Sequence, residues 1–148
     1  MNRAEIIDLL VEQARSISHR GRLDDPDVVM PGGNPDCGDV VTVFLKVDRE
    51  HDRVEAASFV GEGCTISQAA ASVLMEQVQG IPLSSIEAMD GSDLMDTLGR
   101  DVVRMRPRCA TLALSTLKGA VKQCRREQER ERPASRTGED AGRDAARG

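Results

Sequence analysis

The hydrophobic pattern of the chain changes abruptly after Cys64, and this change limits the possible folds more than any other feature of the sequence. Before it, residues 40–47 and 53–60 are rich in β-branched side chains and are separated by the polar segment 48–52, a pattern that predicts a two-stranded antiparallel hairpin. After it, apolar residues recur at helical spacing over 67–79. The sequence therefore predicts a hairpin followed by helices.

Further helices are expected on both sides of the hairpin. Apolar periodicity, together with the positions of Pro and Gly, predicts helices over 4–18, 83–89, 92–98 and from Pro107 to about Arg126. Residues 19–36 contain so many Gly and Pro residues that they cannot continue a helix or lie in the centre of a sheet. We expect a loop there that leads to Cys37 and supplies further strand pairing.

The length and composition fit a single folded domain. The 148 residues, 39% of them hydrophobic, are enough for one compact core, which we assign to residues 1–126. Residues 127–148 show no aliphatic periodicity, so we expect a charged, disordered tail there. Aromatic residues make up only 1% of the chain, which argues for an aliphatic core and against platforms that stack bases or sugars.

Charge and hydropathy exclude two further classes of partner. The formal net charge is −5, and the acidic excess lies within residues 1–124, whereas a nucleic-acid-binding surface needs a basic face. A membrane span of about 18 apolar residues is absent, and acidic residues interrupt the first 18 positions where a signal peptide would be apolar. We therefore expect a cytoplasmic protein with protein partners, whose cysteines are metal ligands, reactive thiols or core residues.

Cysteines at three separate places are candidate metal ligands. Cys37 and Asp39 are two residues apart in an extended segment, so both side chains point to one face and can share an ion. Cys64 precedes one predicted helix and Cys109 lies in the first turn of another, where the helix dipole stabilises a thiolate. Cys64 and Cys109 are equally compatible with small buried residues under a helix N-terminus, and Cys37 and Asp39 with a turn cysteine and a surface carboxylate. Spacing alone leaves these interpretations open.

The fourth cysteine, Cys124, is a different case. It follows Cys109 by 15 residues on the same predicted helix, which separates the two thiols by roughly 22 Å at about 1.5 Å per residue. It cannot reach the same ion, so we expect it in the core. The sequence also lacks a C-x-x-C pair, which disfavours a zinc finger or ribbon.

Three cysteine-centred motifs resemble those of the U-type iron-sulfur cluster assembly scaffolds, a family that comprises IscU, the N-terminal domain of NifU and SufU. The motifs are Asn-Pro-Asp-Cys-Gly-Asp at 34–39, Gly-Glu-Gly-Cys-Thr-Ile-Ser at 61–67 with Ala-Ala-Ala-Ser at 69–72, and Arg-Cys-Ala-Thr-Leu at 108–112. They occur in the order found in the family, and the resemblance covers about residues 4–124.

The resemblance implies both a fold and a site. The fold is α+β, with a small antiparallel β-sheet packed against a bundle of helices, the N-terminal helix first and the long C-terminal helix last. Cys37, Cys64 and Cys109 are implied to be the candidate persulfide acceptors and, with Asp39, the ligands of iron, a [2Fe–2S] cluster or zinc. The carboxylate makes such a site labile, since an oxygen donor holds these metals less firmly than a thiolate.

Within the family, the motifs are most similar to those of SufU, although the chain lacks the additional segment that SufU carries between its second and third cysteines. IscU has a His directly before the third cysteine, and this chain has Arg108 there. We expect Arg104, Arg106 and Arg108 to offset the negative charge of the site and to favour thiolate.

The function implied by the resemblance is that of a scaffold rather than an enzyme. A cysteine desulfurase supplies sulfur, iron binds, and a nascent [2Fe–2S] cluster passes to client apo iron-sulfur proteins. One alternative is a zinc-dependent sulfurtransferase, similar to SufU, that accepts persulfide sulfur without building a cluster. Another is a binding module with structural zinc, which we rank last because the apolar helices predict a core that survives metal loss. Whether the chain forms a homo-oligomer is left open.

Overall fold

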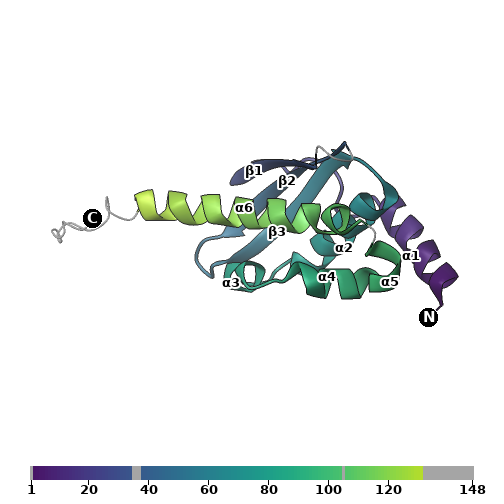
Figure 1. The fold of residues 1–148 in the computed structure, drawn as a ribbon. Helices are drawn as coiled ribbons and strands as arrows, with labels where there is room; N and C mark the ends of the chain where they lie inside the picture. Colours follow the sequence, from purple (N-terminus) through teal and green to yellow (C-terminus); the bar gives the residue numbers. More distant parts are fainter. Residues whose placement is uncertain (1, 35–37, 105, 132–148) are drawn as a thin grey trace.

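The computed structural model describes residues 2–34, 38–104 and 106–131, and in these residues three strands and six helices form an α+β fold (Figure 1). In chain order the elements are α1 (Arg3–Arg15), β1 (Val28–Asn34), β2 (Asp39–Asp48), β3 (Arg53–Glu62), α2 (Thr65–Val78), α3 (Leu83–Glu87), α4 (Gly91–Leu98), α5 (Arg100–Val103) and α6 (Pro107–Glu131). The predicted fold class is confirmed, with a helix first and the long helix last.

The sheet is antiparallel in the order β1-β2-β3, so the predicted hairpin is confirmed and β2 lies in the centre. Side chains alternate between the two faces of a strand, and those of β2 that join the core shared with α2 and α6 are Val41, Val43, Leu45 and Val47. Phe44 points to the other face, where the Arg22 guanidinium lies 5.2 Å from the centre of its ring. Both faces of the central strand are therefore covered at this point.

Strand β1 corrects the expectation that residues 19–36 form only a loop. Its residues Val28–Asn34 pair with β2, which confirms the expected additional strand pairing. A strand that contains Pro31 and two glycines is tolerated because β1 lies at the edge of the sheet and pairs on one side. Gly32 also has a packing reason, since a side chain at this position would overlap the Thr116 hydroxyl of α6.

Helix α1 begins with a capping box, in which the Asn2 side chain accepts from the Glu5 N–H and the Glu5 carboxylate accepts from the Asn2 N–H. After the helix ends, Arg20 ties it to the rest of the domain. The guanidinium donates to the Ala14 carbonyl at 2.8 Å and to Gln68 Oε1 of α2 at 2.6 Å, and it lies 4.6 Å from the centre of the Phe59 ring. The N-terminal helix is thus fixed to α2 and β3.

Helix α6 is longer than the sequence predicted. It continues past the expected end near Arg126 to Glu131, so the first residues of the predicted tail are helical. A hydrogen bond of 3.2 Å from Gln123 to Glu127, one turn later, supports this extension, and the rest of the predicted tail, 132–148, lies outside the described residues. Helix α5 was not predicted either, because four residues carry no readable periodicity.

Within the described part of the chain, no helix is both long and apolar enough to cross a bilayer.

Candidate metal centre

Three elements that are distant in the sequence bring potential metal ligands together. Asp39 is the first residue of β2, Cys64 is the N-cap of α2, and Cys109 lies in the first turn of α6. One ligand atom from each residue lies within 4.8 Å of the other two. Three of the four residues predicted from the sequence therefore meet at one place, and the fourth, Cys37, lies outside the described residues.

The Asp39 carboxylate is the most enclosed of these groups, with only 2% of the residue exposed. Its Oδ1 accepts a hydrogen bond of 3.0 Å from the Cys64 backbone N–H, and its Oδ2 lies 3.7 Å from the Cys64 Sγ. A buried carboxylate needs such partners, because the loss of hydration would otherwise be costly.

Gly63 explains how the carboxylate comes so close to the start of α2. A Cβ at Gly63 would overlap Asp39 Oδ1 and would lie 2.8 Å from Asp39 Cγ and 2.6 Å from Ser67 Oγ. Only a glycine leaves this space open. The Ser67 hydroxyl in turn donates to the Cys64 carbonyl at 3.0 Å, which reinforces the first turn of α2. These roles of Gly63 and Ser67 were not predicted, although their place within the second motif was a usable signal.

The two thiols differ in exposure. Cys109 is buried, with 3% of the residue exposed, whereas Cys64 is half-buried. The site is thus anchored in the core on one side, at Cys109, and is more accessible on the other, at Cys64. This asymmetry favours an exchangeable group over a fully enclosed structural one.

A positive charge lies beside both sulfurs. The pKa of Arg106 is raised above its ordinary value, first by a hydrogen bond with the Cys64 side chain and then by the charges of Cys64 and Cys109. Arg106 is one of the three arginines expected near the site. Arg106 is exposed and lies directly before α6. Its backbone carbonyl accepts a hydrogen bond of 3.1 Å from the Ala110 N–H in the first turn of α6.

The donor set fits iron or zinc. Thiolate sulfur and carboxylate oxygen are both common ligands of these metals. Two sulfurs and a buried carboxylate oxygen, each able to donate an electron pair, lie within 4.8 Å of one another, so a bound cation suits the site. Asp39, Cys64 and Cys109 would hold such an ion, and the metal would supply a Lewis-acidic centre that keeps the sulfurs as thiolates.

Cys124 takes no part in this cluster. It is 1% exposed and belongs to the hydrophobic core, as expected from the length of the helix. The pKa of the Cys124 thiol is raised above its ordinary value, mainly because burial disfavours the charged thiolate. Cys124 is thus a core residue on the helix that also carries Cys109.

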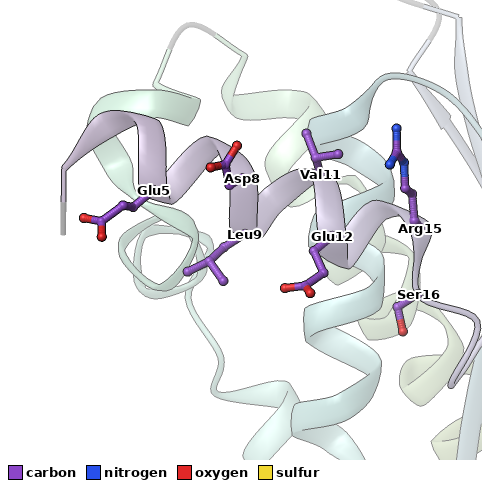
Figure 2. Close-up of a pocket in the computed structure, with 7 residues that line it drawn as sticks. All are labelled: Glu5, Asp8, Leu9, Val11, Glu12, Arg15 and Ser16. Carbon is purple, nitrogen blue, oxygen red and sulfur yellow. The ribbon is translucent and has the colours of Figure 1, made fainter.

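A hollow elsewhere on the surface is a poorer candidate site. It has a volume of about 810 Å³ and is lined by residues of α1 and the residue that follows it, among them Glu5, Asp8 and Glu12 (Figure 2). The hollow is shallow, and its carboxylates lie along one exposed helix. We therefore assign the chemistry to the enclosed cluster of Asp39, Cys64 and Cys109 rather than to this surface.

Comparison with known proteins gives the site a context. The family described as NifU-like N terminal domain matches residues 6–131. A curated relative from Thermotoga maritima, named iron-sulfur cluster assembly scaffold protein IscU, is 36% identical over 135 residues, which cover 80% of this chain and 94% of that protein.

A Bacillus subtilis protein named zinc-dependent sulfurtransferase SufU is 31% identical over 133 residues, covering 78% of this chain and 88% of that protein. A crystal structure of a nitrogen-fixing NifU-like protein (N-terminal) from Brucella abortus superimposes with a TM-score of 0.65 at 24% identity, covering 80% of this chain and 96% of that one. At this identity the structural likeness concerns the fold.

Proposed function

Because the chain belongs to the NifU-like N terminal domain family, we propose that it is an iron-sulfur cluster assembly scaffold, which accepts sulfur from a cysteine desulfurase and binds iron. The nascent [2Fe–2S] cluster would be held by Cys37, Asp39, Cys64 and Cys109 and then passed to client apo proteins. The observation that carries this proposal is the meeting of three of these ligands, from three different elements, within 4.8 Å.

The sulfur-transfer step uses a thiolate of this chain as the nucleophile. A thiolate of Cys37, Cys64 or Cys109 attacks the terminal sulfur of the desulfurase persulfide, one S–S bond forms as another breaks, and the desulfurase cysteine leaves as a thiolate. The half-buried Cys64 is more accessible to a docked partner than the buried Cys109. Reduction of the transferred sulfur to sulfide takes two electrons from an external donor.

Release of the cluster depends on the mixed donor set. A carboxylate oxygen holds iron less firmly than a thiolate, so the Asp39 side provides the weaker bond. We place this function in the cytoplasm, where thiols stay reduced, and in the folded domain rather than in the charged tail. The chain is then a sulfur acceptor and carrier, not an enzyme.

A second function has its own supporting observation. Arg108 occupies the position where IscU has a His, and the Bacillus relative is named a zinc-dependent sulfurtransferase. Under this alternative, zinc at the same four residues would mask the thiols until the desulfurase docks, and sulfur would pass on without cluster assembly.

Metal analysis and reconstitution separate the two functions. The protein is purified without oxygen, and its iron and zinc are counted. It is then incubated with iron and either sulfide or a mixture of desulfurase, cysteine and a thiol reductant. We expect visible absorbance of a [2Fe–2S] cluster that transfers to an apo ferredoxin. A colourless product that keeps one tightly bound zinc per chain and still accelerates the desulfurase would replace the scaffold with the sulfurtransferase.

A further inference from the structure

We propose that the two oxygens of the Asp39 carboxylate have separate tasks, in which Oδ1 fixes the backbone of Cys64 and Oδ2, which lies beside the Cys64 sulfur, would hold the metal. The inference rests on the proposed function for the identity of the cargo. It adds a positioning role, present before any metal binds, to a residue that the motif marks as a ligand.

The hydrogen-bond geometry divides the two oxygens. Oδ1 accepts the Cys64 N–H at 3.0 Å, whereas Oδ2 is the oxygen that lies 3.7 Å from Cys64 Sγ. Oδ2 would therefore be the oxygen that holds a metal together with the Cys64 sulfur. A metal held in this way would leave the hydrogen bond between Oδ1 and the Cys64 N–H in place.

The surroundings hold the carboxylate in this orientation. Asp39 is 2% exposed, and Gly63 lies so close that a single added carbon would overlap Oδ1. The carboxylate is thus enclosed between the start of β2 and the start of α2. This confinement keeps Oδ1 on the Cys64 N–H.

The N–H that Asp39 satisfies belongs to the N-cap residue of a helix. Cys64 is the N-cap of α2, and helix N-termini have backbone N–H groups without partners inside the helix. Asp39 provides such a partner from strand β2, while the Ser67 hydroxyl donates to the Cys64 carbonyl at 3.0 Å. The backbone of Cys64 is therefore held on both sides, which keeps its thiol in place when the site releases its cargo.

One pair of variants tests the hydrogen bond between the Cys64 N–H and Asp39 Oδ1 in the metal-free protein. Asp39→Asn retains a carbonyl oxygen that can accept the Cys64 N–H, whereas Asp39→Ala removes it. We expect hydrogen exchange of the Cys64 amide, followed by NMR, to be at least about tenfold faster in Asp39→Ala than in Asp39→Asn. Equal exchange rates in the parent protein and in Asp39→Ala would overturn the proposal.

A second variant perturbs the same hydrogen bond and leaves every candidate ligand in place. Gly63→Ala pushes against Oδ1, and Gly33→Ala is its matched control, because a Cβ at Gly33 lies at an ordinary 3.5 Å from the Asp39 carbonyl oxygen. We expect Gly63→Ala to weaken zinc binding about 10- to 100-fold in a chelator competition and to speed exchange of the Cys64 amide. Gly33→Ala should bind zinc as the parent does.

The outcomes keep the two proposals apart. Unchanged zinc affinity in a folded Gly63→Ala protein would overturn the positioning role and leave the scaffold function intact. If the parent protein bound neither iron nor zinc, the proposed function would fail. The amide exchange of the Asp39 variants would still decide whether Asp39 holds the Cys64 N–H. Should Gly63→Ala fail to fold, the same exchange comparison decides alone.

Discussion

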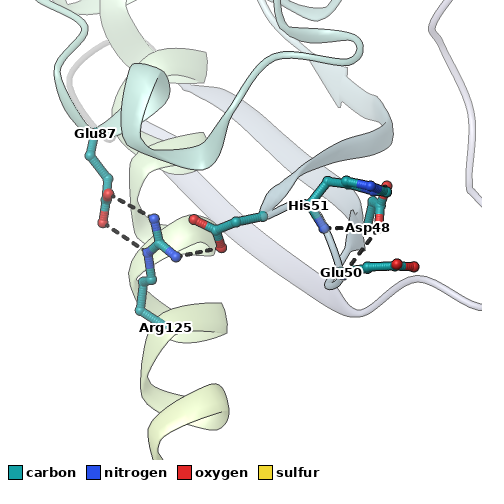
Figure 3. A network of polar contacts seen from close by, with 6 residues as sticks. Asp48, Glu50, His51, Glu87 and Arg125 are labelled. Carbon is teal, nitrogen blue, oxygen red and sulfur yellow. Dashed lines mark hydrogen bonds and ion pairs between the residues drawn. The ribbon is translucent and has the colours of Figure 1, made fainter.

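Helix α6 takes part in a polar cluster near each end, and the two clusters are built in opposite ways. Near its start, Cys109 joins Cys64 and Asp39, a group of electron-pair donors with Arg106 as the adjacent cation. Near its end, Arg125 donates to Glu87 at 3.2 Å and 3.4 Å (Figure 3), and it also donates to Asp52 at 2.6 Å.

The difference concerns the chemical groups that make up each cluster. At Arg125 each carboxylate contacts the cation, and these hydrogen bonds, with Glu87 first, raise the pKa of Arg125 further above its ordinary value. This cluster joins α6 to α3 and to the turn before β3, and we assign it a structural role. At Cys109 two sulfurs and a carboxylate oxygen converge within 4.8 Å, a set of electron-pair donors that suits a site that takes up a metal.

The two cysteines of α6 extend the same comparison. Cys109 and Cys124 are both buried, at 3% and 1% exposure. Burial alone therefore does not distinguish a candidate ligand from a core residue. What distinguishes them is position, since the first turn of α6 meets the starts of β2 and α2, whereas Cys124 lies among aliphatic side chains.

The largest expected effect separates these two thiols. Cys109→Ala should weaken iron or zinc binding by at least about 100-fold, because it removes a ligand, whereas Cys124→Ala should bind metal normally and lose about 1 kcal/mol of stability. Chelator competition and urea denaturation measure the two quantities. Equal metal affinity in both variants would remove Cys109 from the site.

The next effect tests the cation beside the sulfurs. Arg106→Gln should slow the acceptance of sulfur from a desulfurase about tenfold, because the guanidinium no longer attracts the anionic persulfide to the thiols. Arg104→Gln is the control, since Arg104 is also an exposed arginine just before α6. Mass spectrometry counts the transferred sulfur over time, and equal slowing in both variants would reduce the role of Arg106 to that of general surface charge.

A smaller effect is expected at the other end of α6. Arg125→Met breaks the contacts with Asp52 and Glu87 and should lower the free energy of unfolding by about 1 kcal/mol, and by less at high salt, since these groups are partly exposed. Metal affinity should not change. Arg126→Met, at the exposed neighbouring position, should leave stability within about 0.5 kcal/mol of the parent, and a similar loss there would show that the ion cluster adds nothing specific.

The smallest effect is a pH dependence caused by Cys124. Because burial raises the pKa of this thiol in the folded protein, the unfolded chain loses the proton first, from about pH 8.5 upward. The folded state then binds more protons than the unfolded state, so stability falls as the pH rises through this window. Urea denaturation at pH 7.5 and pH 9.5 should show a smaller fall in Cys124→Ala than in the parent, and identical falls would contradict the assignment.

Much of the fold was predictable because its signals are local. The hairpin and the helices over α2, α4 and α6 follow from apolar spacing, and Gly99, which ends α4 with a φ of +98°, follows from glycine placement. Strand β1 was underestimated, since Pro and Gly residues conceal a strand that is stabilised by pairing with β2 and by packing on α6. No local pattern reports such contacts.

For the candidate site, the sequence by itself determined the residue types of the candidate ligands and their local positions. It placed Asp39, Cys64 and Cys109 at the starts of a strand and two helices, and the rise of an α-helix excluded Cys124. Only the tertiary structure decided that these three starts meet within 4.8 Å, and that one oxygen of Asp39 holds Cys64 while the other faces its sulfur. The physical reason is that such convergence depends on how β2, α2 and α6 bury their apolar faces together, which is a property of the whole core rather than of any one segment.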